Sequence, residues 1–405
     1  MKISSLFIGN ELLNGQTANM NILSLGRELT AAGFLLTESD TVADGLSAIK
    51  ESLLRKISNS DVVIVCGGLG PTVDDITRQA TALAIGAELG YSEEVCQTLR
   101  EYMAQKKRQP NEDYYRRQSE VIVGAEILDN TVGLAPGLLC DFENTKILLF
   151  PGPPREFTPM VQQILIPLLG EMSPPQVIVE LFHIYEISES RVEKAFQEFL
   201  KKYTFVEPAY CANLGHVKLT ISFSLERKSM RAELIAAVEQ IFGDDLIRKD
   251  RLIDEIAVTL EKRHWSLGTA ESCTGGGIGR EITAYAGASN FFKGSINTYA
   301  NEWKMNLLGV REETLVNFGA VSEECASEMI AGLCRRYELD CGIVVTGIAG
   351  PGGGSEEKPV GTVYIGSQTP KGTLVTKQLF GGSRQEVREQ AVRYALNQLR
   401  RQLLH

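Results

Sequence analysis

The sequence lacks any hydrophobic run that approaches the ~20 apolar residues a membrane-spanning helix needs. Its start, residues 1–9, has one basic residue and a short apolar run without a small-residue cleavage site, so it predicts a first strand rather than a signal peptide. A basic excess is also missing, because 41 Lys and Arg face 51 Asp and Glu, for a net charge of −10. We therefore expect no membrane partner and no direct nucleic-acid binding.

Paired metal ligands are scarce as well. The eight Cys contain no CxxC pattern, and the four His (183, 216, 264 and 405) form no ligand-like pair, which argues against a zinc site. Scattered Cys, several of them inside apolar runs, are typical of reduced thiols in a cytoplasmic protein. What is present is ample core material: 405 residues, 43% hydrophobic, predict two or three domains at ~100–200 residues each.

Three stretches differ in pattern along the chain. Residues 1–172 alternate apolar strands (3–8, 62–66, 147–150) with helical periodicity, which predicts an α/β domain with a largely parallel sheet. Within it, the polar segment 93–118 is interpreted as an exposed helix plus loop. The prolines of residues 172–175 suit a linker.

Residues 176–249 predict a small α+β domain, with strands at 177–184 and 218–225 and helices at 189–200 and 231–242. No chemistry is evident in it, and a spacer or dimerisation role is the simplest interpretation. Residues 250–405 again predict an α/β domain. Its expected strands are 266–270, 295–299, 342–345 and 360–366, and its expected helices are 254–262, 302–308, 323–337 and 384–403.

A glycine loop follows the buried strand 62–66. Gly67, Gly68 and Gly70 could let backbone N–H groups approach a phosphate, since ligands bind at the carboxyl ends of strands in open α/β sheets. Asp74 and Asp75 follow at the start of a helix, 76–85, where carboxylates either cap the helix or hold Mg²⁺ against phosphates. The pattern favours a phosphate or nucleotide site.

Two other loops should meet the glycine loop at the same sheet edge. Glu11 follows the first strand and is either a ligand or a helix cap. Arg155 follows the strand 147–150 and is either a phosphate ligand or a solvated surface side chain.

A second cluster lies in residues 250–405. Ser272 stands at a strand-to-helix turn, where a hydroxyl is either an exposed nucleophile or an N-cap. A nucleophilic Ser needs a base, and Lys304 can serve if burial keeps it neutral, although it could equally be a surface lysine. Cys273 is a rival nucleophile. With Thr346 and the glycine-rich loop 347–354, these residues predict a hydrolase or transferase pocket for a phosphate-bearing substrate.

These motifs resemble those of the CinA family, the competence/damage-inducible proteins. The N-terminal third is similar to the molybdopterin-binding fold family through residues 9–13, 67–75 and 151–156, although Asn10 stands where the family usually has Asp. The C-terminal third is similar to nicotinamide-nucleotide amidases through residues 270–276, 299–304, 319–322, 346–354 and 358–363.

The resemblance implies a cytoplasmic, homodimeric enzyme of pyridine-nucleotide salvage with two activities. The C-terminal domain would convert nicotinamide mononucleotide to nicotinate mononucleotide and ammonia without a cofactor, with Ser272 as nucleophile, Lys304 as base, and Tyr299 and Thr346 lining the site. The N-terminal domain would cleave ADP-ribose with a divalent metal such as Mg²⁺ on Asp74 and Asp75. The substrate-binding residues assigned in this way are Thr274, Gly275, Gly276, Gly350, Gly352 and Gly353 for the amidase, and Glu11, Gly67, Gly68, Gly70 and Glu156 for the pyrophosphatase.

Two other functions compete with this reading. The first domain's likeness would also suit a pterin-binding module of molybdenum-cofactor assembly. The family's name would also suit a non-catalytic partner in DNA uptake that binds a protein rather than DNA itself.

Overall fold

The computed structural model describes all 405 residues, which form two compact units. Unit 1 consists of Met1–Val179 and Phe223–Lys228, and unit 2 of Glu180–Ser222 and Ser229–His405. No helix in the structure combines the length and the apolar character that crossing a membrane requires.

Unit 1 is built on a six-stranded sheet of order β2-β1-β3-β8-β7-β6. The first four of these strands are parallel to one another. Strand β7 pairs antiparallel with β8, and β6 pairs antiparallel with β7. The prediction of a largely parallel α/β sheet is therefore confirmed. The strands of this unit are β1 (Ile3–Ile8), β2 (Leu36–Val42), β3 (Val62–Cys66), β4 (Leu89–Tyr91), β5 (Glu120–Ile122), β6 (Glu126–Leu128), β7 (Gly137–Phe142) and β8 (Thr145–Phe150). The helices are α1 (Asn10–Leu13), α2 (Met20–Ala31), α3 (Leu46–Ile57), α4 (Thr77–Ile85), α5 (Glu93–Gln105), α6 (Glu112–Gln118), α7 (Pro154–Met160) and α8 (Ile166–Met172).

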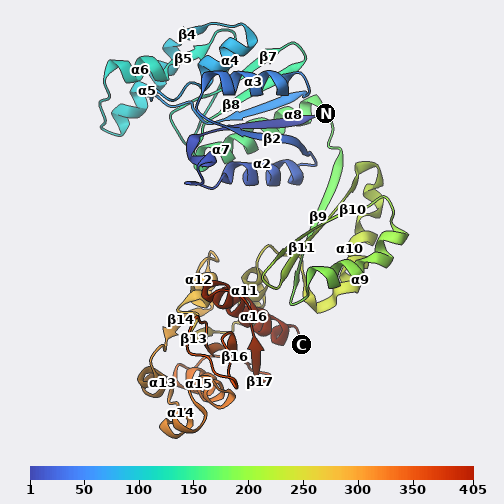
Figure 1. Ribbon diagram of the computed structural model, residues 1–405, viewed down its shortest axis with the longest axis vertical. Coiled ribbons are helices and arrows are strands. Elements are labelled where there is room, and N and C mark those ends of the chain that lie inside the picture. Colours follow the sequence, from blue (N-terminus) through green and yellow to red (C-terminus); the bar gives the residue numbers. More distant parts are fainter. The chain divides into compact units, whose positions relative to one another are not determined.

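Helices cover both faces of this sheet, which explains why its central strands are continuous apolar runs. One core lies between the sheet and helices α2, α7 and α8, and the other lies between the sheet and helices α3 and α4 (Figure 1). The segment 93–118 is two helices rather than a helix plus loop. Its apolar side chains form a small core of their own, which a reading of its charged surface overlooked: Val95, Cys96, Leu99, Met103 and Tyr115.

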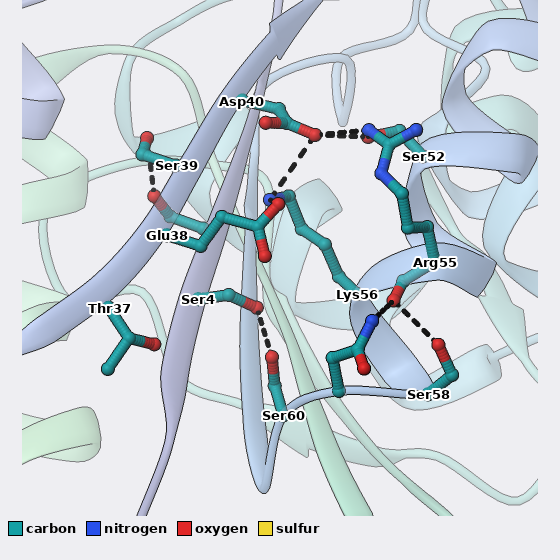
Figure 2. Close-up of polar contacts among 12 residues, drawn as sticks. Ser4, Thr37, Glu38, Ser39, Asp40, Ser52, Arg55, Lys56, Ser58 and Ser60 are labelled. Atoms are coloured by element: carbon teal, nitrogen blue, oxygen red, sulfur yellow. Dashed lines mark hydrogen bonds and ion pairs between the residues drawn. The ribbon is translucent and has the colours of Figure 1, made fainter.

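The edge strand β2 was not predicted, because its sequence LTESDTV is polar. Two of the polar residues of β2, Glu38 and Asp40, lie against the buried ammonium group of Lys56. Lys56 of α3 is 0% exposed, and its Nζ lies 3.2 Å from Oε1 of Glu38 and 3.3 Å from Oδ2 of Asp40 (Figure 2). Asp40 also accepts hydrogen bonds from Ser52 and Arg55. The acidic residues of β2 therefore compensate a charge that would otherwise be costly to bury.

The C-terminal part of unit 2 contains a five-stranded sheet of order β14-β13-β15-β16-β17, which confirms a second α/β fold. Its strands are β13 (Leu267–Glu271), β14 (Phe292–Asn297), β15 (Cys341–Gly347), β16 (Thr362–Thr369) and β17 (Gly372–Leu379), and its helices are α11 (Leu252–Arg263), α12 (Gly277–Thr283), α13 (Asn301–Leu308), α14 (Glu312–Phe318), α15 (Glu323–Arg336) and α16 (Arg384–Leu404). Helices α11, α12 and α16 pack on one face and α13 and α15 on the other (Figure 1). The edge strand β17 and the short helix α14 were not predicted.

The middle segment (residues 180–222 and 229–249) contributes a sheet of order β10-β11-β9-β12. It contains β9 (Val177–Tyr185), α9 (Glu189–Lys202), β10 (Glu207–Asn213), β11 (His216–Ser224), α10 (Arg231–Phe242) and β12 (Leu246–Ile247). The sequence pattern found β9, β11 and both helices but missed both edge strands: β10, most of whose side chains are exposed, and the two-residue strand β12.

Candidate active site

Three neighbouring parallel strands of unit 2 bring the predicted amidase residues to one sheet edge. Strands β14, β13 and β15 are parallel, so their carboxyl ends lie together. Ser272 directly follows β13, Thr346 lies near the end of β15, and the turn after β14 leads into α13, which carries Lys304. This edge is where ligands bind in open α/β sheets. Tyr299 belongs to that turn and not to the strand, as the sequence reading had it, because β14 ends at Asn297.

Ser272 and Lys304 are in direct contact. The Nζ of Lys304 lies 3.3 Å from Oγ of Ser272, and it also donates to the carbonyl of Thr298 at 2.7 Å. Helix α13 can seat this lysine because it packs closely on α15: a Cβ at Gly332 would lie 1.7 Å from the carbonyl oxygen of Leu308. Lys304 is therefore not a surface lysine.

The environment of Lys304 favours the neutral amine. The residue is 1% exposed, and no carboxylate lies within ion-pair distance of it. Burial lowers the pKa of Lys304 below its usual value, against a small opposing effect of nearby thiols. Burial also raises the pKa of Cys273 to about 11, so its thiolate is disfavoured. Of the two adjacent candidates, Ser272 has the base and Cys273 does not.

Ser272 does not cap the following helix. The N-cap of α12 is Gly276, and the carboxylate of buried Glu271 accepts hydrogen bonds from two N–H groups in the first turn of the helix, those of Ile278 and Gly279. The Ser272 hydroxyl is thus left for chemistry. Sequence reasoning missed Glu271, although an acidic residue at the end of an otherwise uncharged buried strand was a visible anomaly.

Two arginines of α16 hold the loops of the site. Arg388 donates to the carbonyls of Cys273 at 3.1 Å and Thr274 at 2.9 Å, and Arg384 donates to Gly350 at 2.7 Å and to the Tyr299 hydroxyl at 3.2 Å. Neither residue was predicted. Their spacing of four residues on the final predicted helix was the available signal, since it places both on one helix face.

The remaining predicted amidase residues differ in their hydrogen bonding, their exposure and their backbone conformation. The hydroxyl of Thr346 donates to the carbonyl of Ala320 at 2.7 Å, and Tyr299 is 65% exposed. Gly275 and Gly276 adopt positive φ in the turn, as do Gly350 and Gly353 in the glycine-rich loop, while a Cβ at Gly352 would meet nothing within 4 Å. In the turn, the backbone N–H groups of Thr274 and Gly276 have no acceptor, so they can donate to an oxyanion.

The three predicted loops of unit 1 also meet at one sheet edge. Gly67 has φ +107°, and a Cβ there would lie 2.5 Å from the carbonyl oxygen of Ile8, at the end of β1. A Cβ at Gly152 would lie 3.5 Å from the Cα of Gly67. Glycine is required at position 67 for this approach of the segments that follow β1 and β3, whereas a Cβ at Gly152 would make an ordinary contact.

A cavity of about 590 Å³ lies beside these loops. Gly68, Gly70, Asp75, Arg155 and Glu156 line it. Asp74 and Glu11 do not line it, and both are exposed. Neither Asp74 nor Asp75 caps α4, whose N-cap is Ile76 without a side-chain hydrogen bond; instead, Asp75 accepts the Thr72 N–H at 2.9 Å. Glu11 likewise gives α1 no capping hydrogen bond.

Helices α5 and α6 and the loop between them complete this cavity with side chains that sequence reasoning missed: Tyr102, Lys106, Arg108, Tyr114 and Gln118. A divalent cation would find Asp75 and Glu156 here, but no group of three or more potential ligands occurs in the chain. Two carboxylates fit Mg²⁺ that is held partly by substrate phosphates, rather than by a protein cage. A carboxylate lies beside Asn10 even though the residue itself is not an Asp. The backbone N–H of Asn10 donates to the carboxylate of Asp44 at 2.8 Å.

Two family models match separate parts of the chain. The family model described as "CinA C-terminal domain" matches residues 249–403, and the model described as "Probable molybdopterin binding domain" matches residues 4–171. A relative from Moorella thermoacetica, named for competence and damage inducibility, is 38% identical over 414 residues, which cover 100% of this chain and 99% of its own. A CinA-like protein of Kosmotoga olearia is 33% identical over 410 residues, with the same coverage.

Among solved structures, the competence damage-inducible protein A of Klebsiella pneumoniae is 40% identical, covers 38% of this chain and 96% of its own, and gives a TM-score of 0.37. The full-length sequence matches carry the assignment. With a molybdopterin-binding-like N-terminal domain followed by a CinA C-terminal domain, this chain belongs to the CinA family.

Proposed function

We propose that the C-terminal part of the chain hydrolyses the carboxamide of nicotinamide mononucleotide to nicotinate mononucleotide and ammonia. The observation that carries the proposal is the 3.3 Å contact between Lys304 Nζ and Ser272 Oγ, made by a buried lysine without a carboxylate partner. A neutral amine beside a hydroxyl is a base beside a nucleophile, which is what acyl transfer requires. The nicotinamide substrate rests on the family resemblance.

The proposed mechanism has two balanced steps. In the first, Lys304 accepts the Ser272 proton as Oγ bonds to the carboxamide carbon, and the C–N bond then breaks while Lys304 returns the proton to the leaving ammonia. In the second, Lys304 takes a proton from water as the water oxygen attacks the ester, and Ser272 regains its proton as the acid leaves. The N–H groups of Thr274 and Gly276, which have no backbone acceptor, would stabilise the oxyanion of each step.

Ammonia release from nicotinamide mononucleotide tests this proposal. We expect release by the native chain and its loss in Ser272→Ala and Lys304→Met. Lys293→Met is the matched control, because Lys293 is an exposed lysine on the neighbouring strand β14. A native chain without activity, or an active Ser272→Ala variant, would refute the assignment.

We also propose that unit 1 cleaves the diphosphate of ADP-ribose. The supporting observation is the cavity beside the Gly67 loop, where Lys106, Arg108 and Arg155 offer positive charge and Asp75 and Glu156 offer carboxylates. The glycine backbone and the three cations would bind the diphosphate, and the carboxylates would orient it through a cation. A divalent metal held there would neutralise phosphate charge and lower the pKa of a bound water.

The two aspartates of the loop provide a matched test. With Mg²⁺ present, AMP release from ADP-ribose should be lost in Asp75→Asn, whose side chain lines the cavity, and retained in Asp74→Asn, whose side chain does not. Ser272→Ala should leave this activity unchanged. Pterin binding without turnover of ADP-ribose would favour a binding module instead.

A further inference from the structure

A cavity of about 710 Å³ lies within unit 2, between α16 and the sheet of the middle segment. Arg384, Arg388 and Arg393 of α16 line it on one side, and Arg280 of α12 adds a fourth guanidinium. The middle segment contributes Lys218 of β11. We call this space the arginine cavity. Neither Ser272 nor Lys304 lines the arginine cavity.

The basic groups of the arginine cavity are mostly not neutralised by the protein. None of the three arginines of α16 forms an ion pair, and they donate mainly to backbone carbonyls. Arg393 donates to the carbonyls of Asn213 and Leu214. Lys218 has no ion pair or side-chain hydrogen bond.

Carboxylates do occur in the lining, at Asp250, Glu281 and Glu389. Glu281 pairs with Arg280 at 3.1 Å, and Asp250 is 89% exposed at its side chain. Arg251, which also borders the space, is bound to Asp254 at 2.5 Å. The lining therefore retains an excess of positive charge, which suits an anionic ligand.

A second observation points to a ligand independently of charge. Thr274 is 1% exposed, lines the arginine cavity, and its hydroxyl has no hydrogen-bond partner. Buried hydroxyls are normally satisfied, so an unpartnered one at a cavity wall marks a place where a bound group would supply the partner. An oxygen-rich anion that accepts hydrogen bonds from both hydroxyl and guanidinium groups has the matching chemistry.

We propose that the arginine cavity binds the phosphate group of a nucleotide, with Lys218 of the middle segment and Arg280 of α12 as ligands alongside the hydroxyl of Thr274. This gives the middle segment a role in ligand binding where the sequence indicated only a spacer. Because Arg388 also holds the carbonyls of Cys273 and Thr274, a phosphate in the cavity sits against the turn that carries Ser272. The phosphate belongs either to the amidase substrate, in which case the inference rests on the proposed function, or to a second nucleotide.

Calorimetric titration of the full chain with AMP, and with adenosine as the phosphate-free control, tests the proposal. Lys218→Ala and Arg280→Ala should each weaken AMP binding about tenfold or more, the loss typical of one charge-assisted hydrogen bond. Lys194→Ala is the matched control, since Lys194 is an exposed lysine of α9 that does not line the cavity. Binding of AMP in unit 1 would be common to all these proteins and would not affect the comparison.

Equal AMP affinity in the native chain, both variants and the control would overturn the proposal. The effect of AMP on ammonia release then separates the two sources. Competitive inhibition, with KM raised and kcat unchanged, identifies the substrate's own phosphate, whereas a change in kcat identifies a second nucleotide. If the native chain releases no ammonia but the variants still lose AMP binding, the amidase proposal fails while this one stands.

Discussion

Replacing Lys304 with Met should remove the proposed amidase activity and leave the fold in place. Methionine fills a similar volume, so the buried site is not left with a void. It leaves the carbonyl of Thr298 without its Nζ donor, at a cost of about 1–3 kcal/mol in the free energy of unfolding. What it loses is the base 3.3 Å from Ser272. Removal of a general base typically slows a reaction by about 10²- to 10⁴-fold, or ~3–5 kcal/mol of transition-state stabilisation.

The same variant carries a signature in stability. In the unfolded chain Lys304 regains the ordinary lysine pKa of 10.5, whereas burial lowers its pKa in the folded chain. Between these two values the unfolded state binds a proton that the folded state does not. The free energy of unfolding of the native chain should therefore rise with pH in this interval, by at most about 1.4 kcal/mol per pH unit from this residue. The penalty is largest below the folded pKa and is gone above 10.5.

Two assays measure these effects. Ammonia release as a function of pH should rise as Lys304 loses its proton, and the rise should be absent in Lys304→Met. Urea unfolding at neutral and alkaline pH should show the added pH dependence in the native chain and in Lys293→Met, but not in Lys304→Met. Retention of full activity by Lys304→Met, or an identical pH dependence of its stability, would refute the role of a neutral lysine.

Three further substitutions test other parts of the structure. Ser272→Ala should abolish ammonia release with an unchanged thermal midpoint, and residual release would mean another nucleophile. Glu271→Gln should lower the free energy of unfolding by roughly 1–3 kcal/mol in urea titration, because an amide cannot accept both the Ile278 and Gly279 N–H groups as well as a carboxylate does. Burial alone would raise the pKa of Asp40, but hydrogen bonds from Arg55 and Ser52 and the charge of Lys56 outweigh it and lower that pKa. Asp40→Asn should therefore destabilise the chain at neutral pH, and the difference from the native chain should shrink as pH falls through the acidic range; a constant difference would contradict this.

The sequence predicted the central strands well because these are buried on both faces. The runs 3–8 and 62–66 coincide with β1 and β3. The missed strands β2, β10 and β17 lie at sheet edges, where few side chains are buried and polar residues replace the apolar pattern. The short strands β4, β5, β6 and β12 were also missed. Strand β7 is the exception, because it was missed inside the six-stranded sheet although its first four residues are buried.

The site divides along a similar line. Ser272 directly follows β13 and Lys304 lies in α13, the helix after β14, so local pattern and the family resemblance were enough to find them. Glu271 and Arg388 act through contacts that the pattern of neighbouring residues does not contain, since Arg388 meets a carbonyl 115 positions earlier in the chain. In unit 1, Asp75 lines the cavity and its neighbour Asp74 does not, which the sequence alone could not predict. That distinction depends on the turn made by Thr72 with Asp75.

The hydrogen bonds from Arg388 of α16 to the turn after Ser272 join segments that are synthesised at different times. The ribosome delivers residues 271–276 well before Arg384 and Arg388, so β13 and α12 emerge while the turn's carbonyls still lack their guanidinium partners. Nascent chains and fragments that stop before α16 would have the nucleophile and its base in sequence but not the fixed turn. The proposed amidase centre therefore gains the contacts of Arg388 to its turn only after α16 has been synthesised.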